Sequence, residues 1–230
     1  MLAEAQTLDD WKSEDLLKPF YAGGKVQYSS NCVLSFLFEE NVHTFAYDDS
    51  HNSELQSVRT TGPRLRNNSI TQSEQISCFC MSRDGEVLAT VSNGFVLKHW
   101  AVQEKECKKN IKIHKSPVIC MDFDATSTLV ALGSVDGAVR IWDICRGYCT
   151  HTFKSHTDIV RIVAFRQESS TINIFSGSDD GSLKCFDLVK SKCVADFKCH
   201  VGSLTAMSFS EHGNSSILAT VGRDKVWTLL

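Results

Sequence analysis

Short runs in which apolar residues alternate with small or polar residues recur along the second half of the chain. Three such runs are "PVICMDFD" (117–124), "IVRIVAFR" (159–166) and "SLTAMSFS" (203–210). Each is followed by a second short apolar run, "TLVALGS", "INIFSGS" or "ILATVG", and then by a turn signal. Alternation with a period of two predicts half-buried strands, and these segments show no helical period.

The strand groups are copies of one unit that is about 43 residues long. The Asp-Gly turn at Asp136 returns at Asp180, and Asp224 holds the same place in a third copy. A weaker copy lies upstream, where Ile76–Gly94 aligns with Ile119–Gly137 without a gap. An Asp-Gly pair supplies the positive φ that a tight turn requires, so we interpret these aspartates as turn residues rather than as catalytic groups.

Four short strands per unit, joined by turns, are typical of a β-propeller blade. We therefore expect an all-β fold, an incomplete propeller arc of about five blades. The expected divisions are an acidic tail at 1–17 and blade units at about 18–60, 75–102, 117–145, 158–189 and 203–230. In the first unit, residues 33–38 and 42–47 are expected to form a hairpin, and 55–59 a strand before a polar loop.

The turns, the Trp142-Asp143 pair and the histidine before each unit resemble those of WD repeats. Within these, "KPFYAGGKVQ" (18–27), the block "IHKSPVICMDFDATSTLVALGSVDGAVRIWDICRGYCTHTFKSH" (113–156), "DIVRIVAFR" and "VGRDK" resemble in order the transducin beta-like protein three family. The resemblance implies two tandem propellers without a catalytic role, of which this chain supplies the opening part. It also implies a nucleolar location in the small-subunit processome, among WD-repeat proteins bound to small nucleolar RNA that guides cleavage of pre-ribosomal RNA.

The WD-repeat resemblance further implies a buried hydrogen-bond chain in each blade, formed by a loop His, a strand hydroxyl, the turn Asp and a Trp. The residues at these positions are His114, Asp136, Trp142, His156, Ser176, Asp180, His200, Thr220 and Asp224. Every copy departs from the full set, because Leu132 replaces one hydroxyl, Phe186 replaces one tryptophan and Trp227 comes too early in the last copy. We therefore expect the blades to be held more by apolar packing than by polar chains.

The balance of charge limits how the chain can contact nucleic acid. With 24 Lys and Arg against 27 Asp and Glu, the formal net charge is -3, so any RNA contact must be local or made through a partner. The best local candidate for contact with RNA or an acidic partner is a lysine cluster between two units: Lys105, Lys108, Lys109, Lys112 and Lys115. We expect no secretory signal and no membrane span, because the start is acidic and no apolar stretch approaches about 20 residues.

Ten cysteines occur, and none of them form a C-x-x-C pair. Four lie in apolar strand-like runs: Cys78, Cys80, Cys120 and Cys185. We expect reduced, mostly buried thiols, no metal site, no cofactor and no small-molecule substrate.

Other classes of protein share parts of this pattern. A WD-repeat adaptor of a ubiquitin ligase, or a generic WD-repeat interaction platform, is the main alternative; such adaptors often carry W-D-x-R, but Arg146 comes one residue late. A G-protein β-like subunit needs an amino-terminal coiled coil, for which residues 1–17 are too short. An enzyme is not expected, because the paired carboxylates at 9–10, 39–40, 48–49 and 179–180 fall at the terminus or in turns.

The last segment, "RDKVWTLL", brings its third strand too early, whereas propellers of this family close with about seven blades. We interpret the chain as a truncated or alternatively spliced product, or as a partial gene model. An arc without closure exposes sheet faces at both ends. We therefore expect self-association or poor folding toward the termini, with Ile76–Leu188 the most ordered part.

Overall fold

The computed structural model describes residues 26–28, 33–38, 41–46, 54–58, 75–168, 171–212 and 215–230. All regular elements in these ranges are β-strands, so they contain no helix that could cross a membrane. The acidic tail, the strand expected near Phe20 and the polar loop after the fourth strand lie outside the described residues.

The strands form five antiparallel sheets, which we number in chain order. The first sheet contains β1 (Val26–Tyr28), β2 (Val33–Phe38), β3 (Asn41–Ala46) and β4 (Glu54–Val58). The second contains β5 (Ile76–Met81), β6 (Val87–Ser92), β7 (Val96–Ala101) and β8 (Glu106–Lys112). The third contains β9 (Val118–Phe123), β10 (Leu129–Ser134), β11 (Ala138–Asp143) and β12 (Tyr148–Lys154). The fourth contains β13 (Val160–Glu168), β14 (Thr171–Ser178), β15 (Ser182–Asp187) and β16 (Lys192–Lys198), and the fifth contains β17 (Leu204–His212), β18 (Ser215–Gly222) and β19 (Trp227–Leu229).

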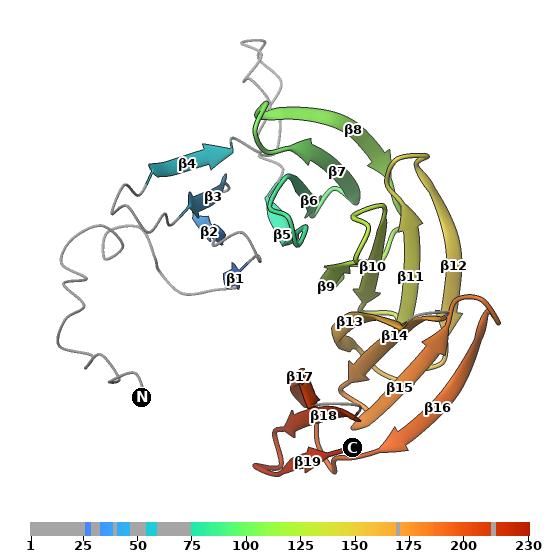
Figure 1. The fold of residues 1–230 in the computed structure, drawn as a ribbon. Helices are drawn as coiled ribbons and strands as arrows, with labels where there is room; N and C mark the ends of the chain where they lie inside the picture. Colours follow the sequence, from blue (N-terminus) through green and yellow to red (C-terminus); the bar gives the residue numbers. More distant parts are fainter. Residues whose placement is uncertain are drawn as a thin grey trace, which may run out of the picture.

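The sheets follow one another around an open arc (Figure 1). Within each sheet the strands lie in chain order. The first strands β5, β9, β13 and β17 face the inside of the arc, and β8, β12 and β16 form its outer side (Figure 1). Sheet order and radial arrangement confirm the predicted incomplete propeller arc.

Most strands coincide with the alternating runs of the sequence, including the predicted hairpin of β2 and β3. The predicted units at 75–102, 117–145 and 158–189 contain three strands each, and the outer strands β8, β12 and β16 follow them. The fifth sheet has only three strands within the described residues.

A tight turn with one left-handed residue joins the second strand of a sheet to the third. These residues are Phe95, Gly137, Gly181 and Lys225, with φ of 60°, 72°, 77° and 62°. The amide of Phe95 donates to Ser92 O at 2.9 Å, as the amide of Gly137 does to Ser134 O at 3.2 Å. Phe95 is therefore the equivalent of Gly137, and the ungapped alignment that placed Gly94 there was wrong by one residue. The sequences were aligned one residue out of register because Phe95 occupies a left-handed position that usually favours glycine.

Apolar side chains fill the spaces between neighbouring sheets. Leu97 and Leu132 belong to the cluster between the second and third sheets, and Ile141 and Ile174 to the cluster between the third and fourth. All four are fully buried, and each such side chain contributes about 1.5–3 kcal/mol relative to exposure. The four cysteines predicted to lie inside strands are buried, which confirms that expectation: Cys78, Cys80, Cys120 and Cys185.

Candidate functional site

The fourth sheet contains a hydrogen-bond chain centred on His156, which lies buried in the loop before β13. Its Nε2 is 2.7 Å from Ser176 Oγ on β14, and its Nδ1 is 3.1 Å from Asp180 Oδ2 in the turn. Burial lowers the pKa of His156 against the opposing attraction of Asp180. The neutral imidazole therefore donates to the carboxylate through Nδ1 and accepts from the serine hydroxyl at Nε2.

The fifth sheet repeats this arrangement around His200. Its Nε2 lies 3.0 Å from Thr220 Oγ1, and its Nδ1 lies 3.1 Å from both carboxylate oxygens of Asp224. Trp227 takes no part, since its side chain is 68% exposed. The place of the blade tryptophan is taken by Leu230, whose amide and carbonyl pair with Leu218 as a strand partner.

The third sheet has the predicted His114 and Trp142 but does not join them. Both ring nitrogens of His114 and the indole Nε1 of Trp142 are buried without a hydrogen-bond partner. The reason is Leu132, which occupies the register position that Ser176 holds in the fourth sheet. Burial, followed by the nearby positive charge of Arg140, lowers the pKa of His114 to about 4.

Asp136, the turn carboxylate of the third sheet, binds Arg140 instead of the histidine. Its Oδ1 accepts from Arg140 Nη1 at 3.0 Å and from Ser134 Oγ at 2.6 Å. This guanidinium, which is largely buried, holds the pKa of Asp136 well below its usual range. The role of Arg140 was not predicted from the sequence, although its position opposite Leu132 distinguishes this blade from the next.

Part of the same hydrogen-bond arrangement occurs in the second sheet. Trp100 Nε1 donates to Thr90 Oγ1 at 3.0 Å, and both side chains are buried. This pair was not predicted from the sequence, because its copy lacks the Asp-Gly turn before the third strand. The ten-residue separation of a hydroxyl and an aromatic, as in Ser176 and Phe186, was the available signal.

The one carboxylate pair that the structure describes is divided between two different partners. Asp179 and Asp180 are adjacent but separate in role: Asp179 Oδ2 accepts from Arg161 Nη2 at 2.7 Å, and Asp180 holds His156. The other three carboxylate pairs lie outside the described residues. Among the residues that the structure describes, no group of three or more His, Cys, Asp or Glu could hold a metal ion. In the part of the chain that the structure describes, these side chains stabilise the sheets that contain them.

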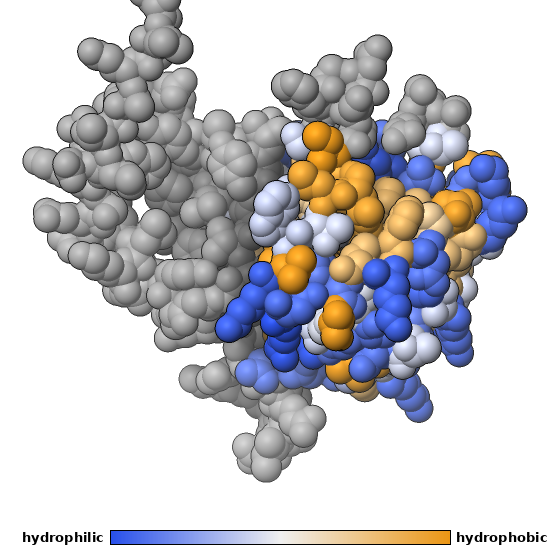
Figure 2. All heavy atoms as spheres, turned by 90° about the horizontal axis from the view of Figure 1, so that it is seen from below, coloured by the Kyte–Doolittle hydropathy of each residue, from blue (hydrophilic) through white to orange (hydrophobic). Residues whose placement is uncertain are grey.

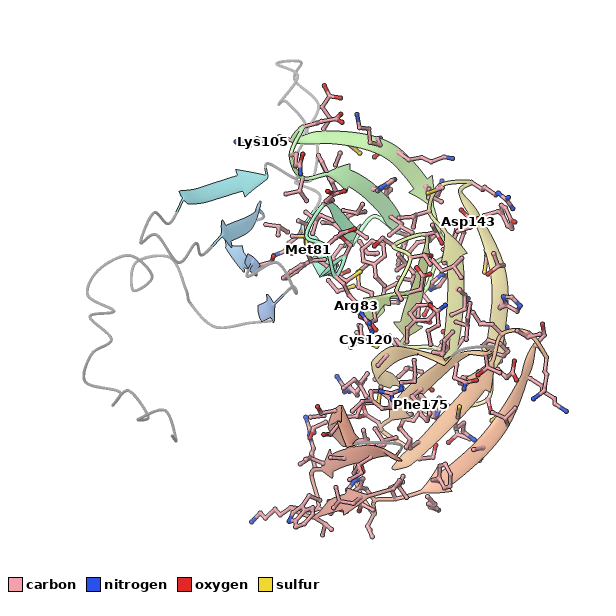
Figure 3. All side chains as sticks on the ribbon, in the orientation of Figure 1. Met81, Arg83, Lys105, Cys120, Asp143 and Phe175 are labelled. Carbon is pink, nitrogen blue, oxygen red and sulfur yellow. The ribbon has the colours of Figure 1, made fainter. Side chains whose placement is uncertain are left out.

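The predicted lysine cluster is spread along β8 rather than gathered into one patch. Lys105 lies in the turn before this strand, on the outer side of the arc (Figure 3). Lys108 forms an ion pair with Glu104, and Lys109 Nζ donates to Cys145 O of the next sheet at 2.7 Å. The remaining two members are exposed: Lys112 ends β8, and Lys115 lies in the loop after it.

Sheets arranged radially, with polar side chains that bind within each sheet, define a β-propeller protein. The family model described as "WD domain, G-beta repeat" matches residues 105–143, 147–187 and 191–229. The chain belongs to this WD-repeat family. Each matched repeat begins near the outer strand of one sheet and ends in the third strand of the next.

Curated relatives cover most of the chain. It is 36% identical over 220 residues to "Transducin beta-like protein 3" of Rattus norvegicus, covering 94% of this chain and 26% of the relative. It is 40% identical over 153 residues to the Homo sapiens protein of that name, covering 66% and 18%. Identity to "U3 small nucleolar RNA-associated protein 13" of Saccharomyces cerevisiae is 35% over 92 residues, covering 40% and 11%. The chain thus spans about a quarter of the rat relative's length.

Two solved structures share the fold. A chain of "Crystal Structure of Mitotic Checkpoint Complex" has a TM-score of 0.69 at 19% identity, covering 86% of this chain and 56% of that chain. The computationally designed Ika4 protein has a TM-score of 0.59 at 20% identity, covering 70% and 93%. At these identities the likeness concerns the fold alone.

Proposed function

We propose that the chain is a non-catalytic scaffold in ribosomal RNA processing and small ribosomal subunit biogenesis, within the small-subunit processome of the nucleolus. The observation that carries the proposal is its 36% identity to rat transducin beta-like protein 3 across 94% of the chain. The name of the yeast relative, U3 small nucleolar RNA-associated protein 13, supports an assembly that contains small nucleolar RNA. The partners are other WD-repeat proteins of a pre-ribosomal complex, with RNA contacted locally or through them.

The geometry suits a scaffold because the buried polar side chains of the fourth and fifth sheets bind one another. His156 and His200 each hold a hydroxyl and a carboxylate inside their own sheet. The parts of the molecule that are open to partners are therefore its turns and the outer strands β8, β12 and β16. Surfaces presented by a repeated rigid unit are how solenoid and propeller proteins bind other macromolecules.

A localisation and pulldown experiment tests this function. The tagged chain is expressed in cultured cells, with the tag alone as control. We expect the tagged chain to concentrate in the nucleolus and to co-purify with pre-ribosomal RNA and other WD-repeat proteins.

The adaptor alternative gives the opposite result. A cytosolic chain that co-purifies with cullin-type ligase subunits and without pre-ribosomal RNA would contradict the scaffold proposal. The position of Arg146 argues against that alternative, because it comes one residue later than the arginine of the W-D-x-R pattern.

A further inference from the structure

Three lysines stand at one register position on the outer strands of three consecutive sheets. Lys112, Lys154 and Lys198 are the last residues of β8, β12 and β16. They pair across the sheet with the first residues of the third strands: Val96, Ala138 and Ser182. We call these three residues the rim lysines. Since the sheets are equivalent, the rim lysines lie at the same edge of the arc, one per sheet.

Two of the rim lysines each have a second basic residue beside them on the same face of the sheet. Each of these second residues forms an ion pair with an aspartate. Arg140 is two residues from the cross-strand partner of Lys154, and it binds Asp136. Lys184 stands in the same relation to Lys198, and it binds Asp196. These inner cations are largely buried and already hold a carboxylate.

The rim lysines differ from the inner cations in exposure and in pairing. All three are exposed. Among the described residues, no carboxylate forms an ion pair with any of them, whereas Lys108 and Lys190 on the same outer surface do have one. A row of unpaired cations at fixed intervals is thus held on strand ends, which are rigid elements.

We propose that the rim lysines bind the phosphate backbone of an RNA strand that runs along the outer edge of the arc from the second sheet to the fourth. This inference rests on the proposed function and names where RNA is contacted. Phosphodiester chains carry one negative charge per nucleotide at regular spacing, and exposed lysines bind them as point charges without reading sequence. The net charge of -3 means that a local row, rather than the field of the whole chain, must supply the attraction.

The row includes one lysine of the cluster that was predicted from the sequence. Lys112 belongs to the predicted cluster, whereas Lys154 and Lys198 come from later repeats. In the sequence each rim lysine stands two residues before the loop histidine of its repeat, in "KIH", "KSH" and "KCH". That the three lysines stand at equivalent positions, one on each blade, becomes clear only from the structure of the outer strands.

The test measures binding of a fluorescently labelled single-stranded RNA to the full chain over a series of salt concentrations. The variant K112Q/K154Q/K198Q removes the row. The matched control R146Q/K190Q/K192Q removes the same number of charges near the opposite ends of the outer strands. Circular dichroism melting confirms that both variants fold like the parent chain.

We expect the row variant to lose at least tenfold in affinity at physiological salt, with the control within about threefold of the parent. The slope of log K against log salt should fall by about 2, since each single-strand phosphate contact contributes about 0.7. Equal binding by the two variants would overturn the proposal. So would preferential, row-dependent binding of a polyglutamate peptide, which would show that the surface takes acidic protein instead. If the row variant binds RNA as well as the control does, while the tagged chain still co-purifies with pre-ribosomal RNA, the rim-lysine proposal fails and the scaffold function stands. Failure of this proposal is therefore distinguishable from failure of the proposed function.

Discussion

His114 and His156 stand at equivalent places before the first strands of neighbouring sheets, but only one of them has partners. His156 joins Ser176 and Asp180, whereas both ring nitrogens of His114 are buried and unpaired. The difference follows from Leu132, which removes the hydroxyl, and from Arg140, which binds the turn carboxylate. An unpaired buried polar group lowers stability, so the two histidines contribute with opposite sign.

Replacing each histidine by leucine separates these contributions. His156→Leu leaves Ser176 and Asp180 without their buried partner, and we expect it to lower the free energy of unfolding by about 2–4 kcal/mol. His114→Leu removes only unpaired nitrogens and should change that free energy by less than about 1 kcal/mol. Urea unfolding followed by tryptophan fluorescence measures both, and equal costs would show that His114 has a partner after all.

The lowered pKa of His114 makes stability depend on pH. The imidazole is neutral in the folded chain down to about pH 4, whereas in the unfolded chain it protonates near 6.5. Protonation of the unfolded chain therefore lowers the free energy of unfolding progressively as the pH falls from 6.5 toward 4, and has no effect above pH 6.5. His156, whose pKa is also lowered, acts in the same direction.

The carboxylates respond at lower pH, since the pKa of Asp180 is held at about 2 by hydrogen bonds that outweigh its burial. We expect the urea midpoint to decrease between pH 7 and 5, and to decrease less in His114→Leu. An unchanged pH slope in that variant would refute the assignment to His114.

At the scale of elements, the strands that could be predicted from the sequence are those that are covered on both faces by neighbouring sheets. β9, β10 and β11 are rich in apolar residues because both of their faces are packed. The outer strands were placed less well, since β16 ("KCVADFK") is exposed at nearly every position and has no apolar face to reveal it. The site showed the same division: His156, Ser176 and Asp180 could be read from repeated spacing, whereas the Arg140–Asp136 pair could not.

The packing of sheet on sheet depends on glycines in second strands. A Cβ on Gly133 of β10 would lie 2.7 Å from Val160 Cγ1 of the next sheet and would also meet Cys120. A Cβ on Gly94, in a turn, meets nothing closer than Ser92 Oγ at 3.5 Å. We expect Gly133→Ala to destabilise the chain by about 1–3 kcal/mol, because the overpacked sheets must separate.

Gly94→Ala is the matched control for this change. It should alter the free energy of unfolding by less than about 1 kcal/mol, in either direction. Thermal unfolding of both variants provides the comparison. Similar melting temperatures would mean that neighbouring sheets can shift apart at little cost.

At the scale of the whole molecule, the fifth sheet ends the arc with an apolar face, formed by Ile217, Val221, Trp227 and Leu229. These side chains are 38–68% exposed. Figure 2, seen from below the view of Figure 1, shows apolar side chains gathered on this part of the surface. The equivalent of Trp227 in the fourth sheet is Leu183, which the fifth sheet buries completely. The end face thus has the composition of a surface between blades.

We expect the isolated chain to self-associate through this end face, since an exposed apolar patch favours contact with another copy. W227S/L229S should reduce association in sedimentation velocity experiments. V189S/V201S is the control, because those side chains are equally apolar and exposed but lie in turns. A parent chain that stays monomeric at every concentration would refute the expectation.

Hydrogen exchange reports on the distribution of stability along the arc. We expect the slowest exchange in Ile76–Leu188, where each sheet has a neighbour on both sides, and faster exchange in β17–β19. Uniform protection up to Trp227 would show that the fifth sheet is stable without a further blade.

Within the described residues, each sheet contacts only the sheets next to it in the arc. This arrangement also determines how the molecule would respond to mechanical tension. A pull on the carboxyl end loads β19 first, and among the strands that the structure describes its one partner is β18. Once the fifth sheet is extracted, the load passes to β16, again a strand with a single partner. Extension would proceed as a series of discrete yields, one per sheet, and a force record of a single molecule would count the sheets of the arc directly.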